Sequence, residues 1–232
     1  MGFPYCNELC FVSCIVYMNQ RAKKYISSSK VGRPKGTSNP ATALTDKQVS
    51  DLYNACYGSR GLFLRAFISF GLFSGMRVGT IANLTWGQVV DNKNRVRTKI
   101  IVQAEQEKSK RTHIYFLATQ GQRIIQEWVD DVLSKNQNMI STDCLFAGKK
   151  SKTFMSATVS SRMVNNLLKK AQIEQNSSHC LRKTFATNAY VKLGLGAYEI
   201  QKLLNHASVS QSQTYINNLT HNIENALCNM RY

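Results

Sequence analysis

The stretch that decides the fold is His179-Cys180-Leu181-Arg182-Lys183-Thr184-Phe185-Ala186-Thr187. Its spacing is that of a helix on which Leu181 and Phe185 share an apolar, core-facing stripe. His179 and Arg182 stand three positions apart and share a different face. A guanidinium and an imidazole placed side by side can bind a phosphate, the first through a bidentate fork and the second as a further donor. An isolated pair of this kind is more often a surface pair, so the surrounding sequence has to decide.

Segments on both sides of this stretch add residues of the same chemistry. Upstream, Ser74-Gly75-Met76-Arg77-Val78-Gly79 places an arginine where a glycine breaks a helix. Downstream, Leu203-Leu204-Asn205-His206 supplies a second histidine, and Tyr215 follows nine residues later in a short predicted helix. A tyrosine on a helix is more often the edge of a core than a nucleophile. Only its spacing from His206 singles out Tyr215.

The order of these groups resembles the tyrosine recombinase (phage integrase) family, over about residues 45–232. The resemblance implies an α+β fold, mainly α, with a small antiparallel sheet or β-hairpin. It also implies a site-specific recombinase that cuts and rejoins DNA through a 3′-phosphotyrosyl intermediate, in integration, excision or inversion. Neither a cofactor nor a metal ion is implied for this chemistry.

The resemblance also implies a role for each residue of the motif. Tyr215 matches the nucleophile, and Arg77 and Arg182 match the two arginines that clamp the non-bridging phosphate oxygens. His179 and His206 match groups that donate hydrogen bonds or assist proton transfer. A free tyrosine has a pKa of about 10, so its hydroxyl needs positive groups or a base close by. The extra negative charge of a pentavalent transition state is what two arginines would stabilise.

The family's general acid is a lysine in a β-hairpin. Here the predicted hairpin covers residues 100–117, and Lys108-Ser109-Lys110-Arg111 lies near its tip. Lys108 with Ser109 best resembles the family's Lys-Thr/Ser pair, which assigns Lys108 as the acid for the leaving 5′-oxygen. Lys110 remains the rival, because register slips easily in a short hairpin. The alternative for both lysines is contact with DNA phosphates alone.

The charge balance favours a polyanionic partner. The chain has 30 Lys and Arg against 13 Asp and Glu, a net charge of +17, and 43% hydrophobic residues that indicate a folded core. Scarce carboxylates disfavour a two-metal nuclease or transposase. We expect double-stranded DNA as the partner, and a solvated basic face is the alternative at each position. The residues predicted to contact DNA are Arg33, Lys35, Lys110, Arg111, Lys149, Lys150, Lys152 and Lys183.

The first 44 residues differ in composition from the rest. They contain six basic residues and one acid, Glu8. We expect residues 1–44 to form an N-terminal extension and basic flexible arm, and residues 45–232 to form the catalytic domain. Residues 32–36 resemble the core of an AT-hook, which lies in a narrow minor groove; a solvated linker is the alternative. Cysteines at positions 6, 10 and 14 favour an apolar helix face over a metal site.

Periodicity and turn signals predict a mainly helical order. Thr45 and Gln48 form a predicted capping box at the start of the first helix of the domain. Val, Ile, Thr and Tyr predict strands over 95–103 and 111–117, and His113 between them is expected to face solvent or DNA. The predicted helices are 45–56, 61–73, 77–84, 119–135, 158–172, 180–193, 197–204, 209–217 and 221–229.

Three features depart from the family pattern. The position three after Arg77 is usually acidic and supports the arginines, but here it is Thr80. Cys180 stands where a small or acidic residue is usual. Most members also have an N-terminal core-binding domain that closes over DNA, whereas only the predicted arm precedes the catalytic unit here. We expect the missing clamp to come from that arm, a partner or a neighbouring protomer.

These departures leave a second function open. The alternative is a non-catalytic DNA-binding regulator or accessory protein that kept the recombinase fold. If the chain is an enzyme, a further interpretation is relaxation of DNA strands, as in type IB topoisomerases. For the enzyme we expect a homo-tetramer on paired DNA sites, with accessory DNA-bending proteins and a cytoplasmic, nucleoid-associated location. No stretch of the sequence approaches the ~20 apolar residues of a membrane span.

Overall fold

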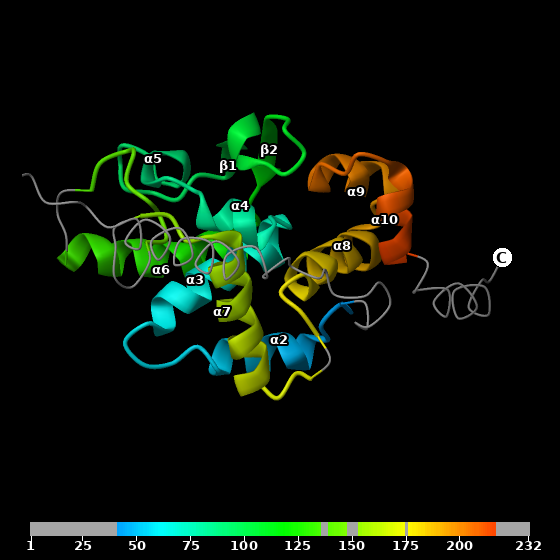
Figure 1. Cartoon of the computed structure of the whole chain (residues 1–232), viewed down its shortest axis with the longest axis horizontal. Helices are drawn as coiled ribbons and strands as arrows, with labels where there is room; N and C mark the ends of the chain where they lie inside the picture. Colours follow the sequence, from blue (N-terminus) through cyan, green and yellow to red (C-terminus); the bar gives the residue numbers. More distant parts are fainter. Residues whose placement is uncertain (1–40, 136–138, 148–152, 175, 217–232) are drawn as a thin grey trace, which may run out of the picture. The chain divides into compact units, whose positions relative to one another are not determined.

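A computed structural model describes residues 41–135, 139–147, 153–174 and 176–216. Element labels follow Figure 1 and begin at α2. The helices are α2 (Asp46–Asn54), α3 (Gly61–Ser74), α4 (Val78–Ala82), α5 (Trp86–Val89), α6 (Thr119–Lys135), α7 (Ala157–Lys170), α8 (Cys180–Leu193), α9 (Ala197–Leu204) and α10 (Val209–Ile216). Strands β1 (Lys99–Val102) and β2 (His113–Phe116) form an antiparallel two-stranded sheet, and a 3₁₀ turn, η1 (Ala104–Gln106), lies between them. The predicted class, mainly α with a small antiparallel sheet, is confirmed.

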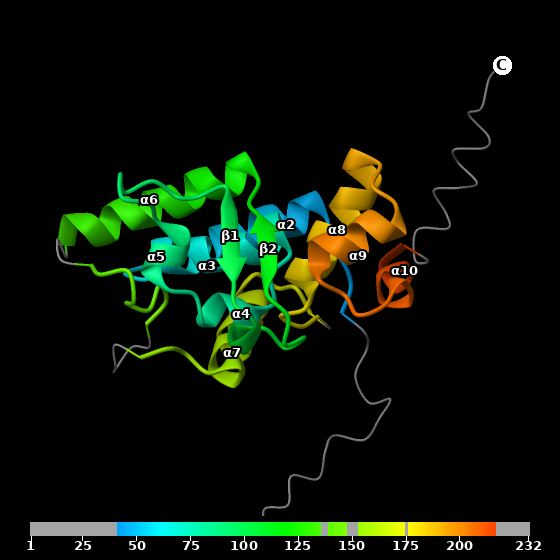
Figure 2. The same ribbon diagram turned by 90° about the horizontal axis from the view of Figure 1, so that it is seen from above.

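Helix α3 is the centre of the hydrophobic core. It is apolar on nearly every side, as expected for a helix that is covered all round. It packs against α6 and α8, and Figures 1 and 2 show α6 running beside it. The Phe146 ring stacks on Trp128 at 4.8 Å between centroids and meets the edges of Phe67 and Phe70. This aromatic cluster fixes α3, whose C-terminal end leads into the site.

The end of α3 is held against α8 and α9 by one glycine. Gly75 caps α3 with a left-handed backbone, φ +69°. A Cβ on Gly75 would lie 2.5 Å from the Phe185 ring and 2.6 Å from Leu204. The position therefore requires glycine both for its conformation and for its space. This close approach brings the segment that carries Arg77 next to the two segments that carry Arg182 and His206.

Most helix boundaries agree with the predictions, and the departures have local causes. The capping box at Thr45 is confirmed, with reciprocal bonds between Thr45 and Gln48. The strands are shorter than predicted, because Val96 pairs separately with Val90 and a 3₁₀ turn replaces the extended chain after Val102. The short helix α5 was not predicted as a separate element. The predicted helix over 221–229 and residues 1–40 of the predicted 1–44 arm lie outside the described residues. The end of that predicted arm packs on the domain, because Leu44 is buried in the core and its N–H donates to the Thr184 hydroxyl at 2.8 Å.

Helices α8, α9 and α10 pack on one another beside the sheet (Figures 1 and 2). A small second core of Ala186, Ala189, Ile200 and Leu204 joins α8 to α9. Helix α9 also contacts β2, so the sheet and this helical group are adjacent. None of the helices in the described part of the chain is both long and apolar enough to cross a membrane.

Candidate active site

A cavity of about 680 Å³ lies where α4, the β1–β2 loop, α7 and the start of α8 meet. Four of the six predicted catalytic residues line it: Arg77, Lys108, His179 and Arg182. They come from segments that are up to 105 positions apart in the chain, and only the tertiary fold brings them together. The other residues that line the cavity are Met76, Val78, Gly79, Thr80, Asn83, Glu105, Gln106, Glu107, Lys110, Ala157, Ser161 and Ser178.

Arg182 is buried and held by backbone carbonyl groups. Only 1% of the residue is exposed. Its Nη1 donates to the Gly75 carbonyl oxygen at 2.6 Å, and its Nη2 donates to the Leu204 carbonyl oxygen. Because a buried guanidinium is costly without partners, these bonds hold the charge in place. One side chain thus joins the end of α3, the first turn of α8 and the end of α9.

Cys180, the second departure from the family pattern, belongs to the core. It is fully buried, next to Leu181, in the main hydrophobic core. Burial raises the pKa of its thiol to about 12, so the thiol is neutral at ordinary pH. The residue acts there as a small apolar side chain.

Arg77 is held by a carboxylate that sequence reasoning missed. It caps the N-terminus of α4, and its Nη1 lies 3.2 Å from Glu107 Oε2. Glu107 is 2% exposed and also accepts bonds from the Thr80 hydroxyl at 3.1 Å and the Tyr115 hydroxyl at 2.7 Å. The acid that the family has three positions after Arg77 is absent, but a carboxylate from the β1–β2 loop lies in its neighbourhood. The one signal in the sequence was an acid directly before Lys108, where Glu105 and Glu107 precede a run of basic residues.

His179 is the N-cap residue of α8 and stands at the open side of the cavity. Packing around the ring and then the positive charges of Arg182 and Arg77 lower its pKa to about 4. The rest of the residue is exposed at the surface. His179 is therefore neutral at pH 7 and has a ring nitrogen able to accept a proton.

His206 is buried and is not among the residues that line the cavity. It is 8% exposed, and burial followed by the charge of Arg182 lowers its pKa to about 3. Its Nδ1 lies 2.9 Å from the Ser212 hydroxyl of α10. If that hydroxyl donates, Nδ1 accepts and the Nε2–H remains as a donor. Tyr215 follows Ser212 by three positions in α10, so the tether at His206 fixes the helix that carries the tyrosine.

Both candidate lysines line the cavity. Lys108 and Lys110 are exposed, and the Lys110 N–H donates to the Glu107 carbonyl oxygen at 3.1 Å in a tight turn. The Asn205 amide donates to the Ser109 hydroxyl between them at 2.9 Å. The lysine-bearing loop is thus bound both to the α4 side and to the α9 side of the cavity.

The predicted DNA contacts fall in different places. Arg111 is exposed beside the cavity loop, and Lys183 is half-buried, with a pKa lowered by burial. Arg33, Lys35, Lys149, Lys150 and Lys152 lie outside the described residues. The expectation for His113 was wrong: its ring is half-buried and Nε2 lies 3.1 Å from the Leu203 carbonyl oxygen, because β2 packs on α9.

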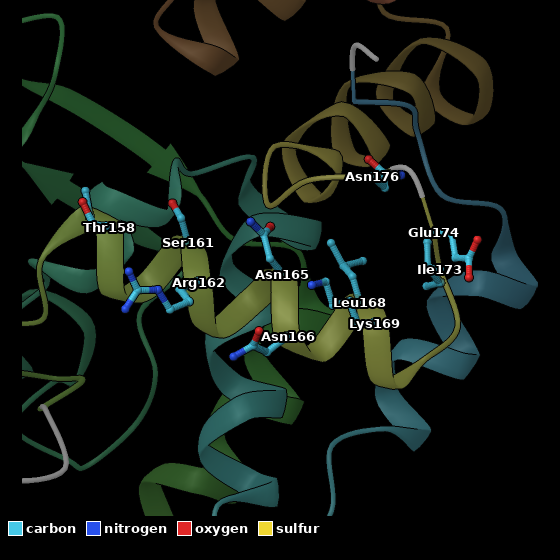
Figure 3. Close-up of a pocket in the computed structure, with 11 residues that line it drawn as sticks. Thr158, Ser161, Arg162, Asn165, Asn166, Leu168, Lys169, Ile173, Glu174 and Asn176 are labelled. Atoms are coloured by element: carbon cyan, nitrogen blue, oxygen red, sulfur yellow. The ribbon is translucent and has the colours of Figure 1, made fainter. Parts of the chain in front are cut away.

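A second hollow of about 950 Å³ follows the polar side of α7. Figure 3 shows Thr158, Ser161 and Asn165 in succession along this helix, with Asn176 beyond them. Its basic side chains are Arg162 and Lys169, both exposed. Ala157 and Ser161 line both hollows, so the two are neighbours across α7.

Solved structures of several recombinases share this fold. XerA recombinase matches with a TM-score of 0.66 and 26% identity, covering 88% of this chain and 69% of that one. XerH site-specific recombinase bound to palindromic difH substrate, in a post-cleavage complex, matches with a TM-score of 0.62 and 20% identity, over 86% of this chain and 56% of that one. A lambda integrase (75–356) dimer bound to a COC′ core site gives a TM-score of 0.56 and 20% identity, over 79% and 62%. The fold is the catalytic fold of tyrosine recombinases.

The sequence comparisons lead to the same family. The model of the phage integrase family matches residues 42–222, so the chain belongs to this family, whose members are DNA-cleaving enzymes. Tyrosine recombinase XerH of Campylobacter jejuni subsp. jejuni serotype O:2 (strain ATCC 700819 / NCTC 11168) is 27% identical over 171 residues, or 73% of this chain. The chain spans 45% of the length of that relative.

Proposed function

We propose that this chain is a site-specific recombinase that cuts and rejoins DNA strands through a covalent link between Tyr215 and a 3′-phosphate. The observation that carries the proposal is the convergence of Arg77, Lys108, His179 and Arg182 on one cavity. A phosphodiester in this cavity would meet two guanidinium groups, which stabilise the charge that develops on its non-bridging oxygens.

The reaction balances without an outside energy source. The Tyr215 oxygen attacks phosphorus and gives up its proton, and the bond to the 5′-oxygen breaks. His179, neutral at pH 7, can take the tyrosine proton, and Lys108 gives a proton to the leaving 5′-oxygen, with Lys110 as the rival. The phosphotyrosine retains the energy of the phosphodiester bond. A 5′-hydroxyl from the same or another strand then attacks it, restores the diester and frees Tyr215.

His206 is assigned the part of a neutral hydrogen-bond donor. Its low pKa, about 3, keeps it uncharged at the pH of the reaction. With Ser212 donating to Nδ1, the Nε2–H can bind a phosphate oxygen. The pair therefore fixes both the tautomer of His206 and the start of the helix that bears the nucleophile.

The proposed partner is double-stranded DNA, and the proposed assembly is a homo-tetramer on paired sites. The net charge of +17 supports a polyanionic partner. The exposed side chains of Lys108, Lys110 and Arg111 at the mouth of the cavity support the same partner. Relatives of the same fold are XerH bound to difH substrate and a lambda integrase dimer bound to a core site. The predicted arm, with Arg33 and Lys35, would add phosphate contacts.

A covalent-capture experiment tests this function. Nicked duplexes with a randomised central segment are incubated with the protein in EDTA, and protein–DNA adducts that survive SDS are isolated and sequenced. We expect the wild-type chain to form an adduct and Tyr215→Phe to form none. Tyr198→Phe, which changes a tyrosine that is 57% exposed on α9, is the matched control and should form the wild-type amount. Binding without any adduct would favour the non-catalytic DNA-binding alternative, and an adduct of equal yield with Tyr215→Phe would exclude Tyr215 as the nucleophile.

A further inference from the structure

We propose that Glu107 is a positioning residue that holds Arg77 toward the phosphate, in place of the acid that this chain lacks at Thr80. The inference rests on the proposed strand-transfer function. It assigns to the β1–β2 loop a task beyond carrying the general acid. Glu107 acts through Arg77 and is not proposed to touch the DNA.

Three donors surround the Glu107 carboxylate. Oε2 lies 3.2 Å from Arg77 Nη1, while Oε1 accepts from the hydroxyls of Thr80 and Tyr115. The Glu107 side chain is fully buried, whereas the Arg77 side chain is 25% exposed. A buried carboxylate is retained only with such partners, and the two hydroxyls fix the plane in which it meets the guanidinium. Arg77 is therefore restrained at its buried end and free to present its exposed side to the cavity.

Thr80 lies beside the Glu107 carboxylate. It is the third residue of α4, and its hydroxyl lies 3.1 Å from Glu107 Oε1. A carboxylate that grew from position 80 would reach the space that the Glu107 carboxylate now occupies. Position 80 and position 107 can thus each supply the carboxylate beside Arg77, and in this chain it comes from Glu107 in the β1–β2 loop.

Glu107 is also linked directly to the two candidate lysines, Lys108 and Lys110. Glu107 immediately precedes Lys108, and its carbonyl oxygen accepts the Lys110 N–H at 3.1 Å. Gln106, on its other side, donates to the Asn83 carbonyl oxygen at 2.6 Å, just beyond α4. A residue clamped in this way sets the position of the lysine-bearing loop and of Arg77 together. An acid at position 80 would hold Arg77 without holding the loop.

The test uses a substitution that preserves shape and a second that restores the charge. Glu107→Gln keeps the volume and the two hydroxyl contacts but places a neutral amide against Arg77. We expect single-turnover cleavage of captured DNA to slow about 100-fold, because misplacement by about 1 Å has effects of that size. DNA affinity should stay close to that of the wild type, since the Glu107 side chain is fully buried. Glu107→Ala empties the space of the carboxylate and should slow cleavage as well, and adding Thr80→Asp to Glu107→Ala should restore part of the lost rate.

The cleavage experiment needs a matched control variant and a result that would overturn the inference. Glu127→Gln removes the same charge from an exposed position of α6, outside the cavity, and should cleave at the wild-type rate. Melting curves establish that each variant is folded at the assay temperature. A folded Glu107→Gln that cleaves at the wild-type rate would overturn the inference. So would a slow Glu107→Ala whose rate Thr80→Asp leaves unchanged in the folded double variant.

An NMR experiment tests the same inference if no cleavage is found. In ¹⁵N-labelled full-length protein without DNA, the Arg77 Nη groups should show separate signals from restricted rotation, identified by their loss in Arg77→Lys. Glu107→Gln should average them, and Glu127→Gln should leave them separate. Averaged Arg77 signals in the wild-type chain would overturn the inference even if cleavage is observed. If the wild-type chain shows separate signals but forms no adduct, the proposed recombinase function is wrong. The inference that Glu107 restrains Arg77 would still stand.

Discussion

On one side of the cavity Arg77 is held by a side-chain carboxylate, whereas on the other side Arg182 is held by two backbone carbonyl groups. The Glu107 side carries its restraint on a loop between two short strands and leaves Arg77 partly exposed. The Arg182 side builds its restraint into helix ends, and the guanidinium is almost completely buried. Charge pairs respond to single substitutions of the partner, while backbone carbonyls move only with the fold. Substitutions on the Arg182 side should therefore lower the free energy of unfolding, whereas substitutions on the Arg77 side should lower the rate of DNA cleavage.

The largest expected effect breaks the Arg182 side at Gly75. Gly75→Ala forces a Cβ to within 2.6 Å of Phe185 and Leu204 on a left-handed backbone. The conformation costs about 1–2 kcal/mol and the overpacking about 1–3 kcal/mol more. Gly194→Ala is the matched control, since Gly194 has φ +68° and no atom within 4 Å of its Cβ position. Urea denaturation should show Gly75→Ala to be less stable than Gly194→Ala by the overpacking cost. Equal losses would mean that the close approach at Gly75 does not restrain the site.

The contrast between the two sides also explains how far the sequence could predict them. Helix α6 has the predicted limits, 119–135, because its periodicity is strong and its N-terminal turn is well marked. The motif around His179 and Arg182 predicted the helix and the pairing of these two groups, since a helix fixes the spacing of its residues. It did not predict the burial of Arg182, because it placed the arginine apart from the core-facing stripe of Leu181 and Phe185. Glu107 was missed because its partner Arg77 is 30 positions away and the loop conformation depends on tertiary contacts. His113 was misjudged for the same reason, since alternation along a strand does not indicate which helix covers it.

A second prediction sharpens the comparison through pH. The pKa of His206 falls from its ordinary value of 6.5 to about 3 on folding, so the unfolded chain binds the proton first. Stability from this residue is therefore complete above pH 6.5 and decreases as the pH falls toward 3. Between pH 8 and pH 5 the loss is about 2 kcal/mol. His179 shifts in the same direction but is exposed, so its share is smaller.

The measurement is the free energy of unfolding from denaturant curves between pH 8 and pH 5. His206→Asn removes the titrating ring and keeps a polar side chain for Ser212, so its curve should be flatter than that of the wild type by about 2 kcal/mol. Tyr198→Phe, which removes a hydroxyl from an exposed residue of α9, serves as a control for general effects of substitution near this helix. Parallel curves for wild type and His206→Asn would show that His206 is not held neutral by the fold.

The smallest expected effect concerns a side-chain bond that joins the two sides, from the Asn205 amide to the Ser109 hydroxyl at 2.9 Å. Ser109→Ala removes it without touching the left-handed backbone of Asn205, φ +52°. A partly buried neutral bond contributes about 1 kcal/mol, so the loss of stability should not exceed that. If the sides are held independently, the cost of Ser109→Ala in denaturant curves should be the same alone and in the Glu107→Gln background. A coupling above about 0.5 kcal/mol would instead mean that the loop transmits the loss of Glu107 to the Arg182 side. The restraints on Arg77 and Arg182 would then act as one unit. Substitutions on the two sides would no longer separate into those that affect stability and those that affect the cleavage rate.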